Sequence, residues 1–395
     1  MKRHLLVLIV GLFVLSGCVT ARHVSPMGMQ DDASIFGMRD IRAVSGTPSE
    51  YMKKDFIDML EQEEKDDPDF QRSGKTFSLL AVSGGASYGA YGAGLLNGWS
   101  SQGSRPAFKI VTGISAGAII ASFAFLGSDY DGKLKEFFTL YSTKDLMRRK
   151  NIIFGFFSNA LASDRRLEGL INKNIDLEFL KKVAAEYRKG RRLYIGTTDL
   201  DVQRLVIWDM GKIATREDDS ALRLFQRIVL ASVSIPTLWP PVYFNIQEKG
   251  KAYDEMHVDG GIAKQVFFLY DVVKGWNQAA KERGLSSEKI KYKIYVIRNG
   301  YVQPVYKAVA NRLSNISLRA MDTMANAEGI GDLYQLYLFT KLRKGDFNLA
   351  YIPSSHVSDP KELFDIKAMR SLFDLGETQA LKGYPWRKYP PGLEE

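Results

Sequence analysis

The stretch FKIVTGISAGAIIASF, residues 108–123, places Ser115 between two glycines, where one apolar run ends and another begins. An apolar strand that turns directly into an apolar helix is typical of an α/β fold. Gly113 and Gly117 allow a tight turn that presents Ser115 at the amino end of the helix, where N–H groups favour a developing anion. The stretch predicts a nucleophilic serine, and the alternative interpretation is an ordinary helix N-cap serine.

The same strand-then-helix pattern recurs along the chain. The predicted strands are TFSLLAVSGG, FKIVTG, RRLYIGTTDLD, RLVIWDM, VYFNIQ, MHVDGG, IKYKIYVIRNG and FNLAYIP. The predicted helices are YGAYGAGLLNGW, AGAIIASFAFLG, SALRLFQRIVLASVS, residues 271–283, most of the sequence from Pro304 to about 345, and 360–381. Alternating elements of this kind form a layered α/β domain. We expect this domain to span residues 74–300, with a mainly helical part at 301–395 packed on it.

The amino end, MKRHLLVLIVGLFVLSGC, has a basic start, an apolar run from Leu5 to Leu15 and small residues before Cys18. This pattern is typical of a secretory signal and is too short for a transmembrane helix. Its ending resembles a bacterial lipoprotein box, in which the chain is cut before an acylated cysteine. We therefore predict a signal peptide at 1–17 and a lipid anchor at Cys18. Cys18 is the chain's only cysteine, which excludes an internal disulfide.

Localisation follows from the same segment. Val19 follows Cys18, and the lack of an aspartate there favours the bacterial outer membrane over the inner membrane. Residues 18–73 are interpreted as a tether with a short helix in EYMKKDFIDMLEQEEKDDPDF. The pattern leaves open whether this segment packs on the main domain or only holds it off the membrane.

The chain has a formal net charge of +9, and removal of residues 1–17, with Lys2, Arg3 and no acidic residue, leaves +7. Such an excess suits an anionic membrane, nucleic acid or simply a solvated basic surface. The sequence has no zinc-ligand spacing and no compact basic-aromatic stripe. We therefore predict no nucleic-acid partner, no metal and no cofactor.

The stretch SGGASYGAYGAG is a candidate anion-binding loop between a strand and a helix. The backbone N–H groups of Gly84, Gly85 and Ala86 could bind an oxyanion, and the same geometry could bind a phosphate. The loop lacks the Lys-Ser/Thr ending of a P-loop. Ser87 and Ala90 stand where a dinucleotide-binding loop needs glycines. An oxyanion hole for acyl transfer is the favoured interpretation.

A nucleophilic serine needs a base, and the chain has only four histidines. His4 lies in the signal and His23 in the tether. His356 lies late in the chain, where an α/β-hydrolase keeps its histidine, although only two strands precede Ser115. His257 shares a strand face with Asp259 and could reach the site.

Asp259 is the stronger candidate base because it ends a predicted strand and is followed by Gly260 and Gly261. Catalytic groups gather at the carboxyl ends of strands in open α/β sheets, and both Ser115 and Gly85 also follow strands. A desolvated aspartate with a raised pKa can accept a proton from a serine. The alternative for this Asp-Gly pair is an ordinary turn.

SGGASYGAYGAG, GISAGA and VDGG, in this order, resemble the patatin-like phospholipases. TTDLD at 197–201 and VLASVSIPTLWPPV at 229–242 also resemble that family, so the similarity covers roughly residues 76–270. The resemblance implies a three-layer fold with a central, mostly parallel sheet and a helical C-terminal extension. It implies phospholipase A-type hydrolysis of a phospholipid or related lipid ester through an acyl-enzyme, without a metal. Ser115 would be the nucleophile, Asp259 the base, and Gly84–Ala86 the oxyanion hole.

Three departures from the family pattern are present. Ala86 replaces the third glycine of the loop, Tyr88 replaces the usual Arg or Lys, and IAKQVFF follows Asp-Gly-Gly where the family often has Asn-x-Pro. Two other functions stay open: an esterase that uses His356 in an α/β-hydrolase fold, and a non-catalytic lipoprotein that binds lipid or a partner.

The segment MRRKNIIFGFFSNALASDRR, 147–166, is aromatic and aliphatic with basic ends. It is interpreted as a lid or lip that contacts lipid. The alternative is a core segment with charged ends.

Overall fold

The protein is described from a computed structural model, which covers residues 22–26, 28–29, 33–67, 75–149, 159–270, 276–284, 290–306, 308–357 and 360–393. The predicted signal peptide, Cys18 and the middle of the predicted lipid-contacting segment, 150–158, lie outside these residues. Within the described ranges, no helix combines the length and the apolar character needed to cross a bilayer.

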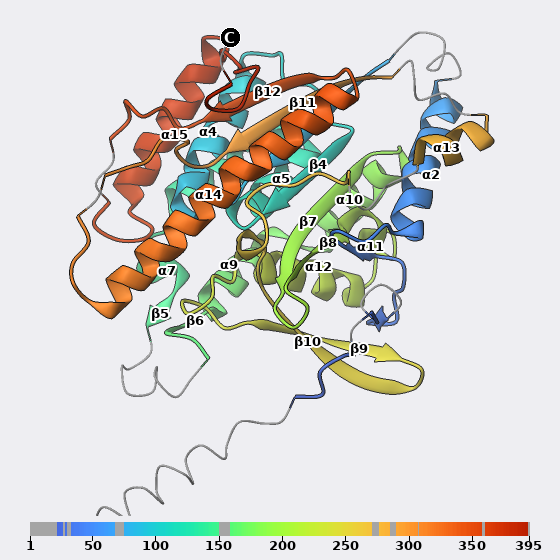
Figure 1. Cartoon of the computed structure of the whole chain (residues 1–395), viewed down its shortest axis with the longest axis horizontal. Coiled ribbons are helices and arrows are strands. Elements are labelled where there is room, and N and C mark those ends of the chain that lie inside the picture. Colours follow the sequence, from blue (N-terminus) through green and yellow to red (C-terminus); the bar gives the residue numbers. More distant parts are fainter. Residues whose placement is uncertain are drawn as a thin grey trace, which may run out of the picture.

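A ten-stranded sheet runs through the described part of the chain (Figure 1). Its central strands, in the order β7-β4-β3-β11-β12, are all parallel. β8, β2 and the β9–β10 hairpin add antiparallel pairs, and β1 pairs with β9. The bounds are β1 Ser34–Ile35, β2 Arg42–Val44, β3 Thr76–Val82, β4 Ile110–Ile114, β7 Arg192–Asp199, β8 Arg204–Asp209, β9 Val242–Glu248, β10 Lys251–Asp259, β11 Lys291–Arg298 and β12 Asp346–Tyr351. A separate two-stranded sheet joins β5 Arg148–Arg149 to β6 Ala162–Ser163.

Helices cover both faces of the sheet, which makes a three-layer α/β fold (Figure 1). Alternate side chains of β3 supply the two cores: Leu80 and Val82 lie in one, and Leu79 and Ala81 in the other. The helices of the first layer are α4 Gly89–Ser101, α5 Ala116–Leu126, α6 Asp131–Thr139, α7 Thr143–Leu146, α9 Arg165–Asn174, α10 Leu177–Arg188, α11 Met210–Ala214, α12 Asp219–Val233 and α15 Ile366–Leu381. Those of the second are α2 Glu50–Asp66, α13 Trp276–Glu282 and α14 Leu313–Leu342. The predicted fold class is confirmed.

The end of the sheet at which β3, β4, β7 and β11 finish is called here the carboxyl edge. Both the Gly84 loop and Ser115 follow strands at this edge, as the sequence predicted. Asp259 arrives differently. β10 is antiparallel to β7, so Asp259 reaches the carboxyl edge from outside the sheet and not along a parallel strand. Asp259 therefore lies at the carboxyl edge, where the sequence places it, but it does not follow a parallel strand there.

The segment before the main domain packs on that domain. β1 and β2 pair with sheet strands, and α2 buries Met52, Phe56 and Leu60 in the core. Of the two possibilities that the sequence left open, the structure therefore has the docked one from Arg22 onward.

The C-terminal part is interleaved with the sheet. β12 pairs in parallel with β11, which extends the central sheet beyond the predicted boundary at residue 300. α15 packs closely on α4 because Gly94 and Gly98 leave room for the backbone of Phe373 and Glu377. This helix begins at Ile366 and not near 360, because Asp365 caps it by accepting bonds from the N–H groups of Lys367 and Ala368.

A buried ion pair fixes α2 to the sheet. Asp55 accepts hydrogen bonds from Arg192 Nε (2.7 Å), Tyr187 Oη (2.6 Å) and Tyr194 Oη (3.0 Å). Asp55→Ala would leave the buried guanidinium of Arg192 without its carboxylate. We expect the free energy of unfolding to fall by roughly 3–5 kcal/mol.

Urea unfolding followed by circular dichroism checks this prediction. The matched control is Asp58→Ala, which removes a half-exposed carboxylate of the same helix that pairs with Lys54 and Arg283. Its cost is expected to stay within about 1 kcal/mol. Equal destabilisation by the two variants would contradict the role given to Asp55.

Candidate active site

Two strands that meet end to end bring Ser115 and Asp259 together. β8 pairs with residues 194–199 of β7, β4 with residues 192–196 and β10 with residues 197–199. Both the β4 range and the β10 range overlap the range that β8 occupies, so β4 and β10 must lie on the opposite side of β7 from β8. They approach each other head-on along that side, and Ser115 Oγ donates a hydrogen bond of 2.7 Å to Asp259 Oδ2.

Ser115 occupies a strained backbone position. Its φ of 55° and ψ of −128° are unusual for a residue with a side chain, and such strain costs roughly 1–3 kcal/mol. A Cβ at Gly117 would overlap the carbonyl oxygen of Val82, and one at Gly113 would overlap that of Gly117. The serine side chain makes no cap hydrogen bond to α5. Its hydroxyl is directed to Asp259, so the interpretation as an ordinary N-cap serine does not hold.

The end of α12 holds the backbone of both residues. The N–H of Ser115 donates to Ser232 Oγ (3.0 Å), and that hydroxyl donates to the carbonyl oxygen of Gly196 (2.7 Å). The N–H of Asp259 donates to the carbonyl oxygen of Ser234 (2.9 Å). These serines lie in VLASVSIPTLWPPV, and the sequence indicated the stretch only by resemblance, without a role for either one.

The electrostatic environment of Asp259 suits proton transfer. Burial raises the pKa of its carboxyl group to about 6, against the opposing effect of bonds from the Ser115 hydroxyl and the Gly261 N–H. The Gly261 N–H donates to Asp259 Oδ1 at 2.7 Å, so each carboxylate oxygen has one donor. A carboxyl group with this pKa is ionised at neutral pH and is a stronger base than an exposed aspartate.

The candidate oxyanion loop has fewer available donors than the sequence suggested. The N–H of Gly84 donates to the carbonyl oxygen of Gln265 (3.1 Å). For the N–H groups of Gly85 and Ala86, no acceptor is found in the described part of the chain. Gly85 has a φ of 149° and Ala86 a φ of 48°, and a Cβ at Gly85 would overlap the carbonyl oxygen of Asn299. These two amides are the candidates for binding an oxyanion.

Asn299 fixes the loop to the end of β11. Its Nδ2 donates to the carbonyl oxygen of Ser83 (2.8 Å) and its N–H donates to Ser83 Oγ (2.8 Å). Its Oδ1 accepts a bond from the N–H of Gly92 on α4 (3.1 Å). No sequence signal pointed to Asn299 beyond its place at the end of a predicted strand.

Gln265 joins the loop to the turn that holds Asp259. Its carbonyl accepts from Gly84, and its Nε2 donates to the carbonyl oxygen of Gly261 (2.6 Å). Its Oε1 accepts a bond from Arg298 Nη1 (3.2 Å), and its own N–H donates to Asp332 Oδ2 on α14 (2.7 Å). Gln265 lies in IAKQVFF, a stretch that the sequence marked only as a departure.

Arg298 places a buried cation behind the loop. Burial lowers the pKa of its guanidinium to about 10, partly offset by the charge of Asp332. Tyr88, at the position of the family's basic residue, stacks edge-on against Tyr301 with ring centroids 5.7 Å apart. The buried cation of Arg298 contacts Gln265 Oε1 and Ser83 Oγ, at the start of the loop.

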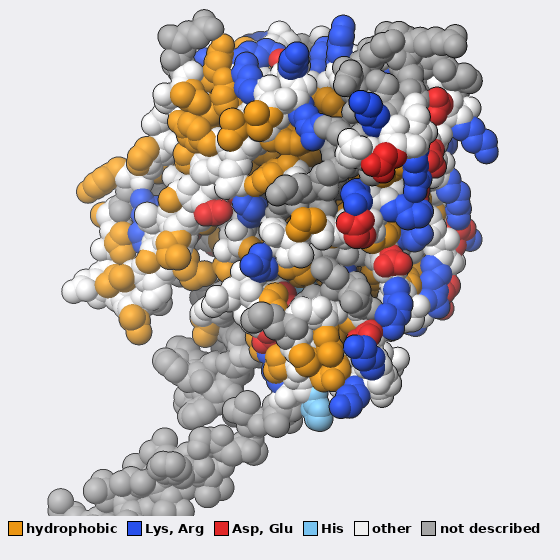
Figure 2. Space-filling view, turned by 45° about the vertical axis from the view of Figure 1, so that its right-hand side comes forward, with side chains coloured by type: hydrophobic (Ala, Val, Ile, Leu, Met, Phe, Trp, Pro, Cys, Tyr) orange, Lys and Arg blue, Asp and Glu red, His pale blue; other side chains and the backbone are white. Residues whose placement is uncertain are grey.

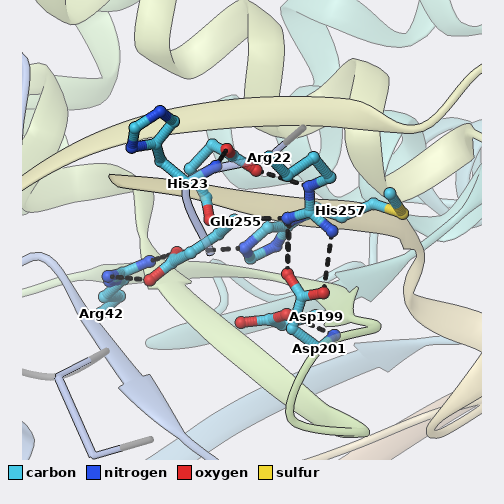
Figure 3. Close-up of polar contacts among 9 residues, drawn as sticks. Arg22, His23, Arg42, Asp199, Asp201, Glu255 and His257 are labelled. Carbon is cyan, nitrogen blue, oxygen red and sulfur yellow. Dashed lines mark hydrogen bonds and ion pairs between the residues drawn. The ribbon is translucent and has the colours of Figure 1, made fainter. Parts of the chain in front are cut away.

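His257 belongs to a separate buried cluster (Figure 3). Its Nδ1 is 2.8 Å from Thr197 Oγ1 and its Nε2 is 3.3 Å from Glu255 Oε2. Donor atoms of Asp199, Glu255 and His257 lie within 4.8 Å of one another, a grouping that could ligate a metal by residue type. Arg42 holds both carboxylate oxygens of Glu255, so in this structure the group is organised by an ion pair.

His356 also lies apart from the dyad. It follows β12, and its carbonyl oxygen accepts a bond from Tyr301 Oη (3.0 Å). Burial lowers the pKa of its ring. Within the described residues, no hydrogen bond joins either His257 or His356 to Ser115.

Residues 80–270 match the family model described as patatin-like phospholipase. Residues 80–270 are therefore similar to a patatin-like phospholipase domain, and the match supports a lipid ester hydrolase in general terms. No curated protein sequence matches the chain.

Solved structures similar to this chain include VipD from Legionella pneumophila, at 14% identity and a TM-score of 0.38, over 78% of this chain and 67% of that one. The type III effector protein ExoU is similar at 12% identity and a TM-score of 0.26, over 91% of this chain and 59% of that one. The fold assignment rests on the family match and on the sheet order.

The raised pKa of Asp259 predicts a pH-dependent cost to stability. Between pH 3.8 and about 6 the unfolded chain loses this proton while the folded protein keeps it, so stability falls with rising pH. Asp259→Asn removes this dependence. Relative to the wild type, the variant should be more stable at pH 8 than at pH 4 by about 2–3 kcal/mol.

Urea unfolding at the two pH values measures this difference. Asp218→Asn is the control, since a bond from the Ala221 N–H lowers the pKa of Asp218 and predicts the opposite sign. A stability difference for Asp259→Asn that is the same at pH 4 and pH 8 would show that the carboxyl is not perturbed.

Proposed function

We propose that the protein is a phospholipase A-type hydrolase that cleaves acyl esters of phospholipids or related lipids with a Ser115–Asp259 dyad. The observation that carries the proposal is the 2.7 Å bond from Ser115 Oγ to Asp259 Oδ2 within a patatin-like domain. The strained turn at Ser115 supports the same function, as do the N–H groups of Gly85 and Ala86, for which the described part of the chain offers no acceptor.

The reaction would proceed through an acyl-enzyme. Asp259 accepts the hydroxyl proton as Ser115 Oγ attacks the ester carbonyl carbon, and the N–H groups of Gly85 and Ala86 bind the resulting oxyanion. The oxyanion collapses, the ester C–O bond breaks, and the alcohol leaves with the proton from Asp259. A water molecule then gives a proton to Asp259 and attacks the acyl carbon. The fatty acid leaves, and Ser115 regains its hydrogen.

We also propose that the protein is a lipoprotein of the bacterial envelope, anchored through Cys18 in the outer membrane. The signal-like segment 1–17 and the lipoprotein-box ending at Cys18 support this location. Two or more acyl chains on one residue provide stable anchoring.

A fluorophosphonate probe tests the dyad. The wild-type protein should be labelled, Ser115→Ala should not be labelled, and Asp259→Asn should react at least about a hundredfold more slowly because it removes the general base. His356→Ala is the control and should react like the wild type. Loss of labelling in His356→Ala would favour the esterase alternative, and no labelling of the wild type would favour a non-catalytic lipoprotein.

The pH dependence of kcat/KM is a second test. Because Asp259 acts in its ionised form, kcat/KM for a lipid ester should fall tenfold per pH unit below about 6. Gln265→Ala frees the Gly261 carbonyl and weakens the Gly261 N–H bond to Asp259, so the acid limb should move to higher pH. Gln265→Asn, which can still donate, should shift it less. An acid limb that is unchanged in Gln265→Ala would refute the coupling.

A further inference from the structure

We propose that the carboxyl edge of the sheet faces the bilayer, held there by Arg22 near the acylated Cys18 and by an apolar stripe on the first half of α14. The stripe is defined as Leu313, Ile316, Ala320 and Met324. The inference rests on the proposed function and on the proposed acylation, and it adds an orientation and a contact surface to both.

Arg22 fastens the amino-terminal segment to the domain (Figure 3). Its Nη1 and Nη2 donate to the two carboxylate oxygens of Asp201 (2.8 and 2.7 Å), and its Nε donates to Asp254 Oδ1 (2.6 Å). The next residue, His23, exchanges two further bonds with Asp254. Burial alone would raise the pKa of Asp201, but its bonds to Arg22 lower it. The chain is therefore fixed to the domain from Arg22 onward.

The chain between the anchor and this attachment is short. Arg22 lies four residues after Cys18, and a fully extended chain of that length spans at most about 14 Å. An acylated Cys18 lies at the membrane surface. The surface that carries Arg22 must therefore lie within this distance of the bilayer, and the segment cannot act as a long tether.

That surface belongs to the carboxyl edge. Asp201 lies two residues beyond the end of β7, past the level at which Thr197 pairs with Asp259. Asp254 lies five residues before Asp259 on β10, and β10 runs from outside toward the carboxyl edge. Asp254 is therefore about 17 Å further from the body of the sheet than Asp259. Both partners of Arg22 thus lie between the dyad and the proposed membrane.

The first half of α14 projects past the same edge. The guanidinium of Arg298, at the end of β11, packs against Gly329 of this helix. The residues from Leu313 to Gly329 therefore extend about 24 Å along the helix from the sheet end. None of the described side chains from 313 to 328 is buried, whereas Leu333 and Leu336 lie in the core.

This projecting half presents the apolar stripe to the outside. Leu313, Ile316, Ala320 and Met324 recur at helical spacing and so share one face. Leu313 is 84% exposed and Met324 72% exposed, and Tyr306, seven residues before the start of the helix, is 93% exposed. Figure 2 shows hydrophobic side chains gathered on the left of the view and charged ones mainly on the right. Exposed apolar clusters of this kind mark a contact surface.

A bilayer is the occupant that explains both features at once. The short attachment brings the carboxyl edge to the membrane, and the stripe lies past that edge beside the loop that carries Tyr88. Burial, and then the charge of Asp322, raise the pKa of the Tyr88 phenol, which places this half of α14 near the loop. Contact with lipid would also turn the end of the sheet that carries the dyad toward the ester groups of the bilayer.

Labelled cysteines test the orientation. Met324→Cys and, as control, Leu381→Cys each add one thiol to a chain whose native cysteine is acylated. Leu381 is exposed and follows Glu377 and Ala380, which contact Gly98 near the end of α4, far from the carboxyl edge. The acylated protein is placed in phosphatidylethanolamine–phosphatidylglycerol vesicles with spin-labelled lipid. A polarity-sensitive dye should be quenched at 324 and not at 381.

Arg22→Ala tests the attachment in the same vesicles. It should leave the protein membrane-bound through Cys18 but reduce quenching at 324. The rate on vesicle phospholipid, relative to that on a soluble short-chain ester, should fall by about tenfold as the stripe leaves the bilayer. Arg283→Ala, which breaks a surface pair with Glu61, is the matched control and should change neither readout.

The outcomes separate the inference from the proposed function. The proposed orientation would be overturned by equal quenching at 324 and 381 or by no quenching at 324. It would also be overturned by a dye shift at 324 that depends on protein concentration without vesicles, which would indicate a second copy of the protein on the stripe. Quenching at 324 by a protein that hydrolyses no ester would support the orientation and refute the proposed function.

Discussion

The active site depends on one edge of β7. β4 uses the first part of that edge and β10 the last part, from the opposite direction, so the two strand ends must meet. Ser115 and Asp259 are the residues at those ends, and their hydrogen bond follows from backbone pairing. The end of α12 also binds the backbone of both residues, so their side chains are held in position for this hydrogen bond. Such preorganisation favours proton transfer without a histidine.

The site is supported by buried polar groups drawn from distant parts of the chain. Gln265 links the Gly84 loop to the turn after Asp259, and Arg298 and Asp332 hold Gln265 from β11 and α14. In a low-dielectric interior such hydrogen bonds are strong when every group has a partner, and each group left without one lowers the stability of the folded protein. The C-terminal part is therefore a support of the site as well as a cover for the sheet. The proposed contact of α14 with lipid would use the opposite end of the same helix.

Much of the fold was predictable because its signals are local. The apolar runs that end in glycine, the junction at Ser115 and the Asp-Gly-Gly turn each report steric needs of a few neighbouring residues. The direction of β10 was not predictable, since an antiparallel strand can end at the same edge as a parallel one. The use of the Gly84 N–H by Gln265 and the docking of Arg22 on Asp201 also join segments far apart in the chain.

The sequence by itself determined the α/β class, the candidate nucleophile and base, and the glycine-rich loop, because residue chemistry and short-range sterics carry that information. Tertiary structure decided which acidic or imidazole group lies beside Ser115. Asp259 ends a strand that meets β4, whereas His257 is turned into a buried cluster with Glu255 and Thr197. It also decided that the N–H of Gly84 is bound to Gln265, whereas those of Gly85 and Ala86 have no acceptor among the described residues. The physical reason is that strand pairing between distant segments decides which groups become hydrogen-bond partners, and a local sequence pattern does not contain this information.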